Sequence, residues 1–287
     1  MWHSMTIIEY TNPSEFLDIL ETAFSAPYEN ELMIGLTSTL ISNPAHYKTT
    51  PILASIKTQQ QKPVVLFLTH PWPIILYAEH TLDSNSIDII INFLNKKRIN
   101  VSGINAKSDI SPLFSQQWIQ NRGCHSKQKM KMTVYTLKKI QKICPCNGKF
   151  IKADKTHVSQ LNHWAKQFHK EMKLDHESDK YIREHVQYMI ESGNAFLWIQ
   201  DEHPVCMTFR ERPHNKGFSI GYVYTPKEER QKGYATSLVH AVCTQSFNES
   251  YQYSVLFADK QNPISNHIYK SIGFKEICDY EMDEFRY

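Results

Sequence analysis

The sequence lacks an apolar segment long enough to cross a membrane. Among its 287 residues, the uncharged stretch Pro63–Ala78 is interrupted by Thr69, His70 and two prolines, whereas a membrane-spanning helix needs about 20 mostly apolar residues in succession. The first nine residues also lack the basic segment and apolar run of a secretory signal. We therefore expect a soluble, cytoplasmic protein with no membrane partner.

Cysteine is scarce, and the six cysteines are spread thinly along the chain. Without an export signal, this favours reduced thiols over a disulfide framework. Cys144-Pro145-Cys146, with Cys124 and His125 upstream, is the one candidate for a zinc site. Its cysteines are separated by one residue rather than the usual two to about four, and no second pair follows at finger spacing. We therefore predict no metal site.

Acidic residues are absent between Asp109 and Asp154. Within this stretch, two lysines and a threonine alternate with Met130, Met132 and Val134, as in a strand with a polar solvent face. The alternative is a basic surface for phosphates or RNA. Because the net charge is only +3, we favour the strand and expect no nucleic-acid partner. The basic residues of the stretch are Arg122, Lys127, Lys129, Lys131, Lys138, Lys139, Lys142, Lys149 and Lys152.

The composition is that of a globular protein, with 41% hydrophobic and 21% charged residues. The length fits two ordinary domains. Pro145 and Gly148 mark a turn after the basic stretch, so we place the division there. The predicted domains are an N-terminal α/β domain, residues 1–146, and a C-terminal domain, residues 147–287.

Hydrophobic periodicity predicts alternating helices and strands in both halves. In the first half it indicates helices over 16–24, 87–94 and 114–119, a hairpin of strands 64–68 and 74–77, and further strands over 99–104 and 129–134. In the second half it indicates strands over 150–153, 195–199, 205–209, 218–224, 253–258 and 276–282, and helices over 161–168, 182–190, 235–242 and 264–272.

One loop of the second half is suited to binding an anion. Arg230–Ala235 lies between a predicted strand that ends at Tyr224 and a helix that begins near Gly233. A turn that opens a helix presents unpaired backbone N–H groups and the positive end of the helix dipole. Glycine lets the backbone approach a phosphate closely. Alone the loop is weak evidence, because a glycine before a helix is often only a turn.

A second motif follows about thirty residues later. Asn262-Pro263 begins a predicted helix, Tyr269 lies on one face of it, and Gly273 ends it. Together, Arg-x-x-Gly-Tyr-Ala and Asn-Pro-x-Ser-Asn-x-x-Tyr-x-x-x-Gly-Phe resemble the GNAT superfamily of acyl-CoA-dependent N-acyltransferases. The resemblance covers residues 148–287. The first half has no comparable glycine loop, and a degenerate copy of the same fold is one interpretation of it.

The resemblance implies an α+β fold with a mixed, mostly antiparallel sheet flanked by helices. It implies acetyl-CoA as cosubstrate without a metal, and a small-molecule or peptide amine as the partner. Tyr269 would be the general acid for the leaving thiolate. The segment that would bind the CoA pyrophosphate is Arg230, Gln231, Lys232, Gly233, Tyr234 and Ala235. The residues that would bind the pantetheine arm are Tyr222, Val223, Tyr224 and Asn262.

The sequence leaves three questions open. By helical spacing alone, Tyr269 could be a core aromatic residue. Many GNAT relatives carry a glutamate on or beside the third strand, but Phe218–Thr225 has no acid, so Glu211, His214, Asp259 or water remain candidates for the base. Because this acid is missing, a second candidate function is that of a non-catalytic CoA-binding or interaction protein, in which the fold is retained without the base. A third candidate function comes from a resemblance to tandem-domain aminoacyl-tRNA-dependent transferases, for which the basic stretch would bind RNA.

Overall fold

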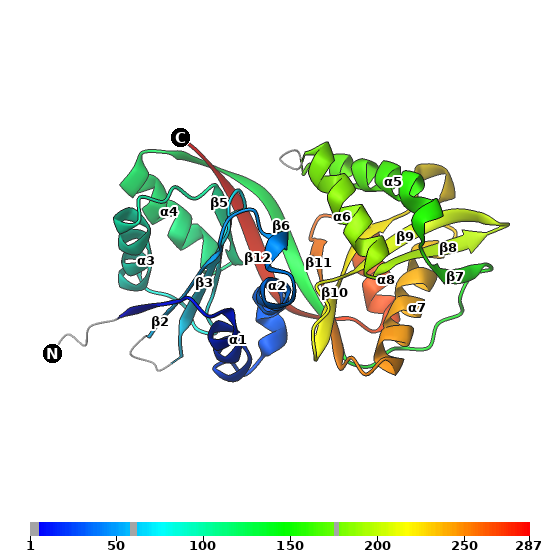
Figure 1. Ribbon diagram of the computed structural model, residues 1–287, viewed down its shortest axis with the longest axis horizontal. Coiled ribbons are helices and arrows are strands. Elements are labelled where there is room, and N and C mark those ends of the chain that lie inside the picture. The colour runs from blue at the N-terminus through cyan, green and yellow to red at the C-terminus, as the bar shows by residue number, and fades with distance from the viewer. Residues whose placement is uncertain (1–5, 58–61, 175–177) are drawn as a thin grey trace. The chain divides into compact units, whose positions relative to one another are not determined.

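The computed structural model describes residues 6–57, 62–174 and 178–287 (Figure 1). Residue contacts divide the chain into two compact units. Unit 1 comprises the residues up to 134, 258–261 and 276–287, and unit 2 comprises 135–257 and 262–275. Among the described helices, none is long and apolar enough to cross a membrane. The division of the chain into the domains 1–146 and 147–287 stays a proposal.

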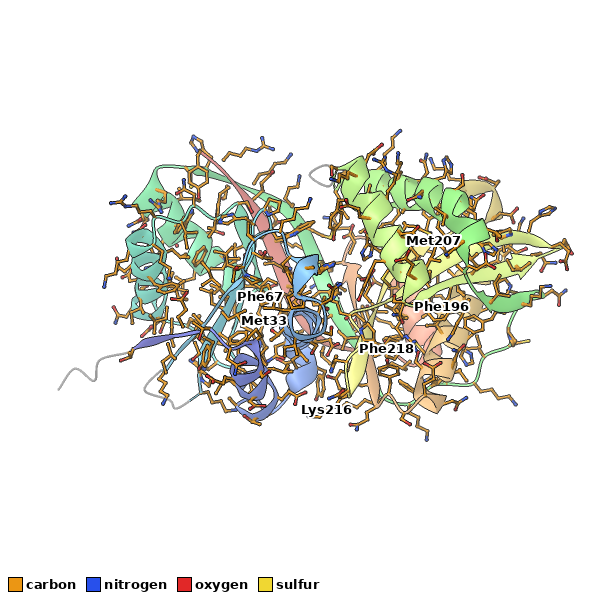
Figure 2. All side chains as sticks on the ribbon, viewed as in Figure 1. Met33, Phe67, Phe196, Met207, Lys216 and Phe218 are labelled. Atoms are coloured by element: carbon orange, nitrogen blue, oxygen red, sulfur yellow. The ribbon has the colours of Figure 1, made fainter. Side chains whose placement is uncertain are left out.

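Unit 1 contains a sheet with the strand order β1-β2-β3-β4-β5-β12-β6. Its first four strands pair antiparallel, β4 and β5 pair parallel, and β12 pairs antiparallel with β5. Met33 and Phe67 lie in one of its apolar cores (Figure 2). The elements are β1 (Ile7–Tyr10), α1 (Pro13–Thr22), α2 (Glu31–Ser42), β2 (Ile52–Ile56), β3 (Val64–Leu68), β4 (Ile74–Tyr77), α3 (Ser84–Lys96), β5 (Gly103–Lys107), α4 (Ser111–Arg122), most of β6 (His125–Leu137) and nearly all of β12 (Lys275–Arg286).

Strand β12 brings carboxylates to the basic strand β6. Lys129 lies 3.6 Å from the Glu284 carboxylate, and Lys131 lies 3.1 Å from that of Glu281. Lys260 pairs with another β12 residue, Asp279. The prediction of a strand in this stretch is confirmed. Two of its lysines are therefore balanced by acids that lie about 150 residues away in the sequence.

Unit 2 contains strands in the order β11-β10-β9-β8-β7, of which only the pair β10 and β11 is parallel. Its core joins α5 and α6 to strands β8, β9 and β10. Phe196, Met207 and Phe218 are among the buried residues of unit 2 (Figure 2). The elements are β7 (Lys149–Lys152), α5 (Val158–Glu171), α6 (Asp179–Glu191), β8 (Ala195–Gln200), β9 (His203–Glu211), β10 (Gly217–Tyr224), α7 (Tyr234–Asn248), β11 (Tyr253–Asp259) and α8 (Pro263–Ile272).

The predicted start and end of helix α8 are confirmed. The Asn262 side chain caps the helix by accepting a hydrogen bond from the Ser265 amide at 3.1 Å. Gly273 ends it with a left-handed φ of 111°. A Cβ atom on Gly273 would lie 3.0 Å from the Lys139 carbonyl oxygen. Both the backbone conformation and the close neighbour therefore require glycine at this position.

The predicted strand over residues 99–104 is wrong. Arg98 has a left-handed φ of 56°, and the Ile99 amide donates to the Leu94 carbonyl, so this segment closes helix α3 and strand β5 begins only at Gly103. Strands β1 and β2 and helix α2 lie where we predicted no element. Helix α2 is apolar on most sides and contains several β-branched residues, so its sequence shows little helical periodicity.

Replacing Phe285 by alanine should destabilise unit 1. Phe285 lies on β12 with 5% of its surface exposed, and its ring centroid is 6.3 Å from those of Phe114 and Trp118. We expect Phe285→Ala to lower the free energy of unfolding by about 3–5 kcal/mol and to speed amide hydrogen exchange in β5. Ile264→Ala, at a residue that is 67% exposed, is the control. Unchanged exchange in β5 would contradict this account of β12.

Candidate functional site

Strands β10 and β11 pair over only three residues each. The parallel pairs are Gly217 with Tyr253, Phe218 with Ser254, and Ser219 with Val255. Within the described chain the two strands have no further pairs, although β10 runs on to Tyr224 and β11 to Asp259. From residue 220 onward, one edge of β10 is therefore left without a strand partner. Such an edge can hydrogen-bond an extended ligand as if it were an added strand.

A β-bulge lies on this open part of β10. The register against β9 shifts between Gly221, which pairs with Phe209, and Tyr224, which pairs with Met207. The bulged residue Tyr222 has a left-handed φ of 51°, which is costly for a residue other than glycine and is typical of functional sites.

Helix α5 and strand β9 hold the side chain of Tyr222. The Tyr222 hydroxyl lies 2.8 Å from Nε2 of His169. Its ring stacks on those of Phe168 and Phe209, with centroid distances of 5.0 and 4.9 Å. The strained conformation of the bulge is therefore stabilised by packing on both neighbouring elements.

The loop before helix α7 presents a row of backbone amides. Gln231 and Gly233 both have left-handed φ values, 64° and 81°, and Gly233 is the N-terminal cap without any side-chain capping bond. For the amides of residues 231–236, no acceptor lies among the residues that the structure describes. Successive amides in such a turn form a concave anion-binding nest, and the helix dipole adds to it.

The cations of this loop are already paired. Arg230 donates to both carboxylate oxygens of Glu171 at 2.8 Å and to the Thr225 carbonyl at 2.9 Å. Lys232 pairs with Glu229 at 2.8 Å. Arg230 thus ties the loop to helix α5. The amides of the loop, rather than these two side chains, are the groups left open for an anion.

Cys146 lies beside the first turn of α7. Its amide donates to the Ser237 hydroxyl at 3.0 Å, and its sulfur lies 3.1 Å from the same oxygen. A Cβ atom on Gly233 would meet only the Cβ of Cys146, at 3.7 Å, so φ and not crowding favours glycine there. Across the described residues, no group of three or more His, Cys, Asp and Glu side chains is placed to hold a metal ion.

Tyr269 is buried but keeps a polar group available. It is 8% exposed, and its ring lies near those of Tyr135 and Phe274, with centroid distances of 6.1 and 5.9 Å. Its hydroxyl has no hydrogen-bond partner within the part of the chain that is described. Burial raises the pKa of Tyr269 above its ordinary value, and the neighbouring Cys206 and Tyr135 raise it further. The hydroxyl is therefore protonated at neutral pH and can act as a donor.

Asn262 orients the helix that carries Tyr269. Its Oδ1 is used by the helix cap, which leaves its amide nitrogen as the group that could bind a ligand. Because Asn262 precedes Tyr269 by about two helical turns, the cap fixes the start of the helix on which the tyrosine stands.

The three candidate bases have different surroundings. Glu211, at the end of β9, is 5% exposed and lies 2.8 Å from Nε2 of His185 on α6. His214 packs against the ring of Tyr253 in the turn between β9 and β10. Asp259 accepts a hydrogen bond from the Gln261 amide in the turn before α8. Only Glu211 is buried, and its partner His185 was missed because a contact between α6 and β9 leaves no local signal in the sequence.

The corresponding helix of unit 1 has no open anion site. Helix α3 follows β4, which pairs parallel with β5, as α7 follows β10 in unit 2. Its cap is Asp83, whose carboxylate accepts from the Ser86 amide at 2.8 Å and from the Ser86 hydroxyl at 2.7 Å. These hydrogen bonds hold the pKa of Asp83 below its ordinary value. A fixed negative charge thus occupies the position that a phosphate would take.

Comparison with known proteins identifies the fold. Residues 206–282 match the family model described as FR47-like protein. A Drosophila protein superposes with a TM-score of 0.69 at 10% identity, covering 98% of both chains. A GCN5-related N-acetyltransferase from Sphaerobacter thermophilus has a TM-score of 0.63 at 9% identity, covering 97% of this chain and 95% of its own.

A tandem GNAT protein from the clavulanic acid biosynthesis pathway has a TM-score of 0.53 at 10% identity, covering 99% of this chain and 98% of its own. No curated protein matches the sequence. The predicted resemblance to the GNAT superfamily and the predicted fold class are confirmed, and the tandem protein supports the two-domain form. At such low identity the likeness concerns the fold, so activity has to be argued from the site.

Proposed function

We propose that this GNAT-fold chain is an N-acetyltransferase that moves an acetyl group from acetyl-CoA to a primary amine. The observation that carries the proposal is the open edge of β10, followed directly by the amide nest before α7. An open strand edge suits an extended chain of amides, and an amide nest suits a pyrophosphate. Pantetheine and pyrophosphate are joined in this order in coenzyme A.

The proposed contacts follow from this arrangement. The amides of residues 231–235 bind the pyrophosphate, with Arg230 holding the loop in place. The backbone of Tyr222, Val223 and Tyr224 pairs with the pantetheine arm, and the Asn262 amide nitrogen donates to it. No metal takes part in these contacts.

The proposed reaction is direct attack of the amine on the thioester. The nitrogen adds to the carbonyl carbon, the oxygen becomes an oxyanion stabilised by a backbone N–H of β10, and the carbon–sulfur bond then breaks. Tyr269 gives its proton to the departing thiolate. Because burial raises its pKa, Tyr269 is a weak acid that stabilises the thiolate by hydrogen bonding as much as by proton transfer.

A non-catalytic CoA-binding protein is the second candidate, because the open part of β10 has no acidic residue. The two functions separate in one assay. Acetyl-CoA is incubated with panels of alkylamines, amino acids and peptides, and free thiol is measured. Thiol release that depends on the amine supports the transferase. If acetyl-CoA binds with micromolar affinity but no amine in the panels causes release of free thiol, the second function is favoured.

One chain should bind one acetyl-CoA. The nest before α7 is open, whereas Asp83 fills the corresponding position in unit 1. Isothermal titration calorimetry should therefore show a single site, with a micromolar dissociation constant corresponding to about 8 kcal/mol. Two equivalent sites would contradict the argument from Asp83, and absence of binding to the folded protein would refute the cofactor assignment.

A carboxylate at position 233 should remove the anion site without unfolding the protein. Aspartate caps helices well and tolerates a left-handed φ better than most residues, so Gly233→Asp should keep its melting temperature within a few degrees. We expect its affinity for acetyl-CoA to fall at least about 100-fold, a loss of about 2.7 kcal/mol. Asparagine has nearly the same shape as aspartate but no charge, so Gly233→Asn should lose much less affinity for acetyl-CoA. Equal losses in both variants would argue against a phosphate at this loop.

Replacing Tyr269 by phenylalanine tests the proposed acid. Phenylalanine keeps the ring packing against Tyr135 and Phe274, so the affinity for acetyl-CoA should change little. Turnover should fall about 100-fold, the lower range for loss of a general acid. Tyr251→Phe, in the turn that follows α7, serves as the control and should retain full turnover. A large loss of affinity in Tyr269→Phe would show that the hydroxyl is structural.

A further inference from the structure

His185 and Glu211 form a buried ionisable pair that the steps above do not use. Nε2 of His185, on α6, lies 2.8 Å from Oε1 of Glu211, at the end of β9. The two side chains are only 9% and 7% exposed. Burying such a pair is costly unless both groups are well satisfied. Glu211 is balanced further by Arg212, whose Nη1 lies 3.7 Å from its Oε2, so the group whose role needs an explanation is His185.

The pair lies against the point where β10 leaves β11. Gly221 is two residues beyond Ser219, the last residue of β10 that pairs with β11. A Cβ atom on Gly221 would lie 2.8 Å from Cγ of Glu211 and 3.5 Å from its Oε1. The absence of a side chain at Gly221 thus lets the glutamate lie directly over the strand, at the start of its open edge.

The bulged strand also contacts the histidine. The His185 ring lies 5.1 Å from the ring of Tyr222 and 5.8 Å from that of Phe209, measured between centroids. Tyr181, one helical turn earlier on α6, stacks on its other side at 6.0 Å. The polar groups around the imidazole are thus Glu211 on β9, Tyr222 on β10 and Tyr181 on its own helix.

The second ring nitrogen of His185, Nδ1, is buried and makes no hydrogen bond in the described part of the chain. When Nε2–H donates to the Glu211 carboxylate, Nδ1 holds a lone pair and can accept a proton. This is the arrangement in which a carboxylate fixes the tautomer of a catalytic histidine.

We propose that His185 is the general base for the acceptor amine and that Glu211 is its positioning residue. The assignment rests on the proposed acetyltransferase function. Nδ1 takes one proton from the ammonium form of the amine, and the Glu211 carboxylate stabilises the imidazolium. The freed nitrogen lone pair forms the bond to the carbonyl carbon, and the carbon–sulfur bond breaks as the thiolate takes the Tyr269 proton.

The protons balance over the cycle. The nitrogen, now bonded to the acetyl group, loses a second proton, which returns through solvent to the Tyr269 oxygen. His185 releases the first proton to solvent. The products are the acetylated amine, coenzyme A as the thiol, and one proton.

The test compares two nucleophiles with acetyl-CoA. One is the alkylamine that gives the fastest thiol release in the panel, which is protonated at neutral pH. The other is hydroxylamine, which is already unprotonated there and needs no base. We expect His185→Gln to lower kcat/KM about 100-fold for the alkylamine but less than about fivefold for hydroxylamine. Glutamine can still donate to Glu211, and His163→Gln, at an exposed residue of α5, is the matched control.

The role of Glu211 has its own readout. In nitrogen NMR of the imidazoles, wild-type His185 should show the Nε2–H tautomer alone, with its signals assigned by their loss in His185→Gln or His185→Asn. Glu211→Gln should produce a mixture of His185 tautomers. It should also lower kcat/KM for the alkylamine much more than for hydroxylamine, as His185→Gln does. If the pair of His185 and Glu211 were purely structural, its variants would lower kcat/KM equally for the two nucleophiles.

The outcomes separate the two proposals. Failure of the wild-type protein to bind acetyl-CoA, or to acetylate any amine, would overturn the proposed function and the base together. If the wild-type protein acetylates amines and His185→Gln has the same kcat/KM, the assignment of the base alone is overturned. The same holds if His185→Gln lowers kcat/KM equally for the alkylamine and for hydroxylamine. An Nδ1–H tautomer of His185 in the wild-type protein would also overturn this assignment.

Discussion

The requirement that backbone polar groups find partners controls this site. A folded chain pairs nearly all of its buried N–H and C=O groups, so a ligand finds unpaired backbone groups only where they are exposed, and unit 2 has two such adjacent places. Strand β10 loses its neighbour after Ser219, and the amides of residues 231–236 precede or begin α7 without acceptors in the described structure. Both openings are polar, neutral and extended. The ligand proposed for this site is inferred from these two features of the backbone alone.

The two units show how one residue decides whether a helix terminus is available. Helices α3 and α7 each follow a strand that pairs parallel with its neighbour. The Asp83 carboxylate accepts from one amide of α3, that of Ser86, whereas Gly233 offers no side chain to the amides of α7. The stability that a capping carboxylate provides is thus absent at the loop for which we propose an anionic ligand. A helix terminus becomes a site only when the chain leaves it unsatisfied.

Local signals were enough to predict the helices and strands of the second half and the place of the glycine loop between them, but not the partners of the residues involved. Helix α8 has Pro263 and Gly273 at its ends, so both boundaries were readable. Strand β5 was misplaced because apolar residues in the preceding loop resemble a strand. The pairing of His185 with Glu211 joins positions 26 residues apart on different elements, and no spacing rule connects them. The ion pairs of Arg230 and Lys232 were also unreadable, because charge alone does not reveal its partner.

The alternation of side chains along β9 places the proposed acid and base on opposite faces of the sheet. Met207 and Phe209 belong to the core with α5 and α6, and Glu211 continues the same face because successive side chains of a strand alternate. Cys206, on the other face, is a neighbour of Tyr269. A proton can therefore leave the amine on the α6 side while another reaches the sulfur on the α8 side.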